Sequence, residues 1–100
     1  MAKNIKFSYL YRDSANYKNF GFVVLDNPTD INLEELENLI RSKLIDNTWF
    51  YASEWGLPNL YFDNMDIEAD PTWHEFESLE YTEEAATNNL HNFQLLLLTA

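Results

Sequence analysis

The chain has 100 residues, 46% hydrophobic and 16% aromatic, which fits one packed domain and excludes a disordered polypeptide. It contains no cysteine, which excludes disulfides, a thiolate nucleophile and thiolate metal ligands. Seventeen acidic and six basic residues give a formal net charge of -11, a field that repels nucleic acid and anionic membranes and attracts basic proteins and cations.

The acidic residues are unevenly distributed. Residues 1–43 carry six acids and all six bases, whereas residues 44–100 carry eleven acids and no base. Solubility accounts for a net charge but does not require this segregation, so the distribution favours a protein surface with a basic partner.

The longest apolar run, Leu95 to Leu98, is too short to span a bilayer. The first ten residues, MAKNIKFSYL, lack the apolar stretch and cleavage site of a secretory signal. We therefore expect a soluble, cytoplasmic protein with no membrane contact.

Two runs near the N-terminus have the period-two alternation of β-strands. Residues 4–12 place four side chains on one face: Ile5, Phe7, Tyr9 and Tyr11. Asp13 to Asn16 predict a turn, because Asp, Ser and Asn bond their own backbone. Residues 17–25 predict the second strand of a hairpin, with Phe20, Phe22 and Val24 on one face. Gly21 indicates a bulge or a ring packed over the strand.

The clearest helical pattern follows Pro28. Asn32 is the expected N-cap, with Glu35 as its capping-box partner. Apolar residues recur at helical spacing, at Leu33, Leu36, Leu39, Ile40 and Leu44. Asp46 and Asn47 end the helix.

The second half of the chain shows further strand patterns and a terminal helix. Short strands are expected over 48–52 and 59–62, and a longer one over 73–82. The mixed faces of this last strand suggest an edge strand with a bulge. A helix containing Leu90, Phe93, Leu96 and Leu97 would be capped by Thr87 or Asn88. The order strand–strand–helix–strand–strand–helix predicts a single α+β domain, residues 1–100, with an antiparallel sheet.

Residues 63–77, DNMDIEADPTWHEFE, combine six carboxylates with no base. Counted from Asp66 to Glu77, the ligand positions of an EF-hand calcium loop are occupied by Asp66, Glu68, Asp70, Thr72, His74 and Glu77. Pro71 argues against this, because it stands where that loop needs a glycine with positive φ. A looser divalent-cation site remains an alternative.

A catalytic interpretation depends on His74 as a general base and on its neighbour Glu75 as the carboxylate partner. Neighbours in a strand point to opposite faces, so this adjacency gives little support for contact. No phosphate loop, nucleophile elbow or histidine metal motif is present. We expect no catalytic residue, metal or cofactor.

We prefer the hypothesis of a surface that binds a protein partner, on which spaced carboxylates and aromatic rings imitate a phosphate backbone. Eight residues are expected to carry the contact: Asp63, Asp66, Glu68, Asp70, Trp73, Glu75, Glu77 and Glu80. The alternative is a pocket for a small nucleotide-like or anionic ligand at the hairpin, formed by Tyr9, Tyr11, Arg12, Tyr17 and Lys18.

Four segments, YRDSANYK, LIRSKLID, EWGLPNL and WHEFE, carry a resemblance over residues 5–84. The chain resembles a set of small acidic uncharacterised proteins of bacteria and mobile elements. That resemblance implies an intracellular single-domain protein and assigns no activity or functional residue.

Together these patterns predict a non-enzymatic acidic protein that inhibits or modulates a basic, nucleic-acid-handling partner, of the anti-defence type found in phages and plasmids. The small-ligand module and a cation-dependent enzyme remain alternatives. A homodimer through the terminal segment LHNFQLLLL is a further option.

Overall fold

The computed structural model describes residues 3–99 and has the α+β architecture that the sequence predicts. Its antiparallel sheet has the strand order β2-β1-β4-β3. β1 (Asn4–Arg12) and β2 (Lys18–Leu25) form the predicted hairpin. In the turn, Asp13 Oδ1 accepts hydrogen bonds from the backbone N–H groups of Ala15 and Tyr17.

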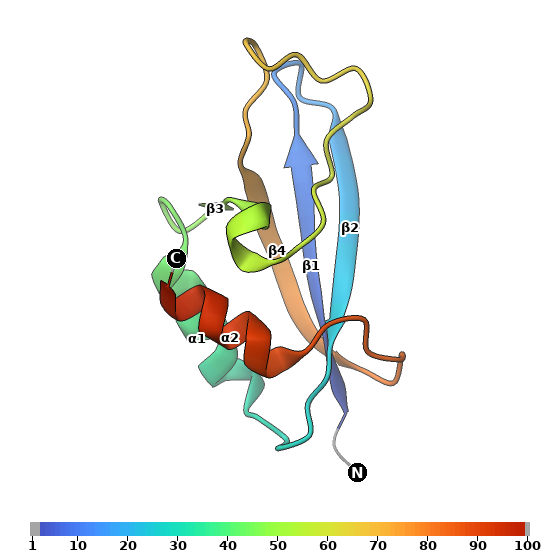
Figure 1. Cartoon of the computed structure of the whole chain (residues 1–100), viewed down its shortest axis with the longest axis vertical. Coiled ribbons are helices and arrows are strands. Elements are labelled where there is room, and N and C mark those ends of the chain that lie inside the picture. The colour runs from blue at the N-terminus through green and yellow to red at the C-terminus, as the bar shows by residue number, and fades with distance from the viewer. Residues whose placement is uncertain (1–2, 100) are drawn as a thin grey trace.

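The two faces of the sheet have different environments. Ile5, Phe7, Tyr9 and Tyr11 share the covered face and are at most 1% exposed. Both helices lie in front of this face (Figure 1). We call the opposite side the outer face. Phe20 and Phe22 lie there, 59% and 49% exposed, since they alternate with the core-facing residues of β2.

Helix α1 (Leu33–Lys43) begins as predicted, because Asn32 Oδ1 accepts from the backbone N–H of Glu35. It buries Leu36 and Ile40. The chain turns after the helix through Asp46 and Asn47, both with positive φ. Asn and Asp tolerate this left-handed conformation better than other non-glycine residues.

The predictions for residues 48–62 are partly wrong. Strand β3 is only Trp49–Phe50, and the next residues form a 3₁₀ helix, η1 (Ala52–Trp55). Residues 59–62 do not form a strand. The backbone of Leu60 bonds side chains instead of a neighbouring strand: its N–H donates to His74 Nε2 and its carbonyl accepts from Asn19 Nδ2.

Strand β4 (His74–Thr82) has the predicted bulge. Ser8 opposes Ser78 and Tyr9 opposes Phe76, so Glu77 is an extra residue on β4. The bulge explains the mixed pattern, because it shifts the core-facing positions by one. β4 is not simply an edge strand, since β3 pairs with its first two residues.

Helix α2 (Leu90–Thr99) buries Leu90, Phe93 and Leu97. The predicted caps Thr87 and Asn88 are wrong. Asn89 Oδ1 accepts from the N–H of Asn92, whereas Thr87 Oγ1 bonds Val24 of β2.

Aromatic rings fill the core between the sheet and the helices. The Phe7 ring centroid lies 5.3–6.3 Å from five others: those of Tyr9, Phe50, Trp55, Phe76 and Phe93. Tilted and edge-on ring pairs at this spacing add to the gain from apolar burial. The core therefore connects β1, the short elements 49–55 and α2.

Candidate functional site

The acidic segment reaches the far end of the sheet. After η1 the chain runs along the sheet and turns back beside the β1–β2 turn (Figure 1). We call residues 63–73 the tip loop. It contains four carboxylates and no base.

Two of these carboxylates shape the tip loop itself. Asp66 Oδ1 accepts from the N–H of Glu68 at 3.0 Å, and Asp70 Oδ2 accepts from the N–H of Asp66 at 2.9 Å. The N–H of Asp70 donates to the Asp66 carbonyl at 2.7 Å. These bonds replace helix or sheet pairing for a segment that has neither.

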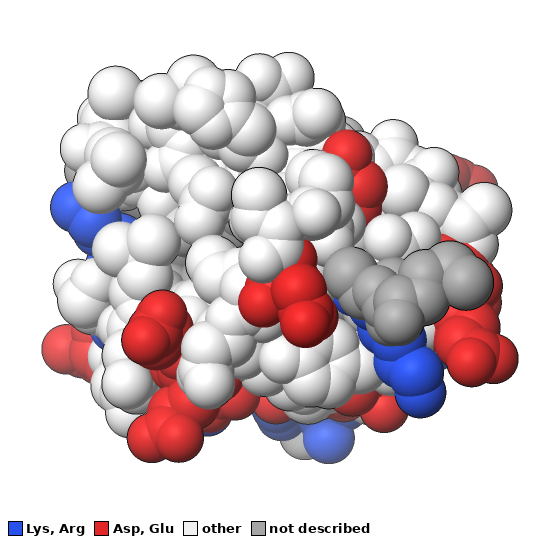
Figure 2. Space-filling view, turned by 90° about the horizontal axis from the view of Figure 1, so that it is seen from below, with Lys and Arg blue, Asp and Glu red and all other residues white. Residues whose placement is uncertain are grey.

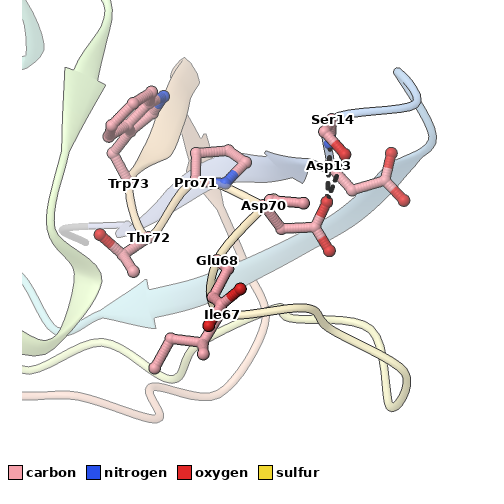
Figure 3. A pocket seen from close by; sticks show the side chains of 9 residues that line it. Asp13, Ser14, Ile67, Glu68, Asp70, Pro71, Thr72 and Trp73 are labelled. Carbon is pink, nitrogen blue, oxygen red and sulfur yellow. Dashed lines mark hydrogen bonds between the residues drawn. The ribbon is translucent and has the colours of Figure 1, made fainter.

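Asp70 also fastens the tip loop to the hairpin. Its Oδ1 accepts from the Ser14 N–H at 3.0 Å and from Ser14 Oγ at 2.7 Å (Figure 3). Hydrogen bonds from the backbones of Asp66 and Ser14, and from the Ser14 hydroxyl, lower the pKa of Asp70 below its ordinary value. The carboxylate is therefore held in its charged form.

An open groove of about 460 Å³ lies between the hairpin turn and the tip loop. Figure 3 shows Asp13 and Ser14 on one side and Ile67, Glu68 and Trp73 on the other. Ile67 is 80% exposed and Trp73 41% exposed. The groove thus combines apolar side chains with surrounding carboxylates.

The structure divides the eight residues predicted for the partner surface. Asp63, Asp66, Glu68, Asp70 and Trp73 belong to the tip loop, whereas Glu75, Glu77 and Glu80 follow along β4.

Two of the three β4 carboxylates lie near bases of β1. Glu75 accepts from Arg12 Nε at 2.8 Å and from Arg12 Nη2 at 3.3 Å. Glu80 is paired with Lys6 in the strand register. Bases of β1 therefore partly offset the negative charge of β4. The tip loop itself contains no base.

Asp13 and Ile67 line the groove but were not among the predicted contact residues. The sequence around Asp13 predicts only the turn of the hairpin. Nothing in the sequence links it with a loop more than fifty positions away. Ile67 is an isolated apolar residue among acids, and its exposure follows from the path of the loop.

The five residues of the predicted hairpin pocket do not gather around one cavity. Tyr9 and Tyr11 are buried, and their hydroxyls donate to the carbonyls of Pro58 and Pro71. Burial raises the pKa of Tyr9 to about 12 and also raises that of Tyr11. Arg12 points to Glu75, while Tyr17 and Lys18 are exposed at the turn.

His74 is a core residue. It is fully buried and lies among the rings of Tyr9, Tyr11, Phe50 and Tyr61. Its Nε2 accepts from the Leu60 N–H at 2.9 Å, so the proton of the neutral ring is on Nδ1.

Burial lowers the pKa of His74 to about 4, while the nearby Thr72 backbone opposes this shift. The Thr72 carbonyl already accepts from the Tyr61 hydroxyl, and His74 Nδ1 makes no hydrogen bond within residues 3–99. The buried, neutral ring of His74 therefore stabilises the segment around Leu60 from the side of the core. The structure gives it no open approach to a substrate.

Within residues 3–99, no three or more His, Asp or Glu side chains are grouped closely enough to hold a metal ion. No helix of that region has the length and apolar character needed to cross a membrane. Comparison of the chain with protein-family models, with curated proteins and with solved structures gave no match.

Proposed function

We propose that this protein is a non-enzymatic, acidic binding protein that inhibits or modulates a basic, nucleic-acid-handling partner, as an anti-defence protein of a phage or plasmid would. The observation that carries the proposal is the tip loop. It places four closely spaced acids, with no base among them, beside exposed Ile67 and Trp73, with Asp13 across the groove.

The chemistry of this surface favours a basic protein over other ligands. The tip-loop carboxylates lie at one end of a molecule whose net charge is -11. They attract a cationic surface over a distance and speed its approach. Exposed Ile67 and Trp73 supply apolar contacts of the kind that dominate binding once the surfaces meet. Nucleic acid is repelled by the same field.

The first experiment is a tagged pull-down from a lysate of the source organism at low salt, with stepwise salt elution and mass spectrometry. We expect a basic nucleic-acid-binding protein to elute at moderate salt, because screening weakens attraction between exposed charges. Absence of any such protein from the eluates would contradict the proposal.

A matched pair of variants then locates the contact. Asp63→Asn with Glu68→Gln removes two tip-loop charges whose side chains make no hydrogen bond or ion pair within residues 3–99. Glu54→Gln with Glu83→Gln removes two exposed charges elsewhere in the same acidic half. We expect only the tip-loop variant to release the partner at lower salt. Equal effects would mean that total charge, not the tip loop, governs binding.

A further inference from the structure

Strand β2 is the last strand at one side of the sheet, so one of its long edges has no neighbouring strand. Backbone groups of alternate residues point to that edge. Those of Val24 are bonded there, because its N–H donates to Thr87 Oγ1 and its carbonyl accepts from the N–H groups of Thr87 and Asn88. The segment around Asn88 therefore already pairs with this edge, in the parallel direction.

The rest of the edge is unpaired. By the same alternation, the N–H and carbonyl groups of Phe20 and Phe22 point away from β1, and no hydrogen bond joins them to another group of residues 3–99. We call residues 18–22 the open edge. Figure 1 shows no helix or strand along the side of β2 that faces away from β1. Backbone donors and acceptors are therefore available there at the spacing of a β-strand.

The open edge has little of the protection that edge strands usually carry. Its pairing with β1 is regular, without a bulge, and β2 contains no proline and one charged residue, Lys18. Phe20 and Phe22 lie exposed beside it on the outer face. Unpaired backbone groups next to exposed apolar side chains are the arrangement that accepts an added strand, which bonds the backbone and packs alternate side chains against the rings.

Charge indicates what kind of extended segment fits. β2 contains no acid, so an apolar segment meets no carboxylate of β2 along the open edge. Beyond Lys18 the edge leads to the hairpin turn and to the tip loop, which Asp70 fastens to Ser14 (Figure 1). The tip loop contains four carboxylates and no base. A segment that leaves the edge at this end therefore favours bases.

We propose that the open edge binds an extended segment of the basic partner as an added antiparallel strand. Apolar side chains at alternate positions of this segment pack against Phe20 and Phe22. Because the segment runs opposite to β2, its C-terminal end reaches the tip loop, where Lys or Arg residues meet the carboxylates. This inference deepens the proposed function and rests on it.

A designed peptide with the sequence TVTVTVKRK is the probe, since its valines alternate and its bases follow them. Hydrogen exchange of single amides is measured by NMR with and without saturating peptide. The amides of Phe20 and Phe22 should exchange about tenfold more slowly in the complex, because the added strand bonds them. The amides of Gly21 and Val23 bond β1 in both states and should not change.

A matched pair of variants tests the backbone contact. Phe20→Pro removes an N–H that points to the open edge and is not bonded to β1, whereas Phe20→Val removes the ring and keeps that N–H. We expect Phe20→Pro to weaken peptide binding by at least about fivefold and Phe20→Val to weaken it less. Circular dichroism checks that each variant is folded. If Phe20→Pro does not fold, the exchange rates in the unmodified chain decide.

Unchanged exchange at Phe20 and Phe22 with saturating peptide would overturn the inference. Protection of the same amides on raising the concentration of the protein alone would also overturn it, because a second copy would then occupy the edge. If the peptide responds to Asp63→Asn with Glu68→Gln but not to Phe20→Pro, the inference fails and the proposed function stands. If TVTVTVTTT binds as tightly as the probe, the tip loop attracts no bases, which contradicts the proposed function and the basic partner inferred from it.

Discussion

His74 connects the core to the segment that leads to the tip loop, and it can do so only while neutral. Nε2 must remain an acceptor for the Leu60 N–H. The pKa of His74 is lowered from 6.5 to about 4 in the folded protein. Below pH 6.5 the unfolded chain therefore binds a proton that the folded chain does not, and stability falls as pH falls towards 4.

We expect this one group to remove about 2–3 kcal/mol of the free energy of unfolding between pH 7 and pH 4. Urea denaturation at closely spaced pH values measures it. His74→Gln, which keeps an acceptor and does not titrate, should lose that part of the pH dependence. An unchanged profile in the variant would show that His74 does not control acid stability.

Asp70 holds the tip loop through bonds to two segments, and a single substitution tests that role. Asp70→Asn leaves one acceptor oxygen in place of two, so Asp66 and Ser14 cannot both keep their bonds to it. We expect faster hydrogen exchange at the amides of Ser14 and Asp66. Asp63→Asn, with the same chemical change on the same loop, should leave both rates unchanged, and equal rates in the two variants would contradict the role.

Packing between elements depends on Gly21 of β2, where the structure shows neither the bulge nor the covering ring that the sequence suggested. The register is regular there, with Gly21 opposite Tyr9. The side chain of Leu60 covers the position, and a Cβ on Gly21 would lie 2.7 Å from Leu60 Cδ2. The strand thus leaves room for the segment between η1 and the tip loop.

Gly21→Val should therefore push Leu60 away and destabilise the fold by about 1–3 kcal/mol, the usual cost of overpacking. Displacement of Leu60 also weakens its bonds to His74 and Asn19. In a double-mutant cycle measured by chemical denaturation, Leu60→Ala should recover part of the loss caused by Gly21→Val. Strict additivity would indicate that the two positions do not interact.

Elements with local signals were predictable from sequence. The alternation in 4–12, the turn at Asp13 and the Asn32 cap each depend on residues a few positions apart, and the structure confirms them. The bulge in β4 was predictable because charged and apolar residues change places along that strand.

The path between η1 and β4 was not predictable, because its bonds are long-range. Leu60 bonds side chains of β2 and β4, and Asp70 bonds a turn 56 positions earlier. The sequence could show that residues 63–70 are acidic, but not that Asp13 lies across from them. It also gave no sign that Arg12 would reach Glu75 instead of a ligand.

At the scale of the whole molecule, the tip loop and helix α2 are at separate places. The molecule measures 45 × 25 × 18 Å along its principal axes, and the tip loop and α2 lie towards opposite ends of the long one (Figure 1). A basic partner bound at the tip loop, as proposed, would therefore leave α2 uncovered, including the broad uncharged surface on that side of the molecule (Figure 2). Added salt should weaken the proposed association with a basic partner.

Charge also sets the stability of the fold itself. Three ion pairs join described residues, Lys6–Glu84, Arg12–Glu75 and Arg41–Glu37, and such pairs at the surface, exposed or half-buried, contribute little. Repulsion within a chain of net charge -11 is the larger effect. We expect the thermal midpoint to rise by about 4–8 °C between low and high salt, which corresponds to about 1 kcal/mol for a domain of this size.

Differential scanning calorimetry over a NaCl series measures this shift. The Asp63→Asn, Glu68→Gln variant should have a higher midpoint at low salt and a smaller rise with salt, because it removes two charges from the most acidic loop. Arg12→Gln, which breaks an ion pair and adds net negative charge, should have the opposite effect on both. A midpoint that falls as salt is added would mean that attraction within the three ion pairs outweighs repulsion between the excess acidic side chains of the folded chain.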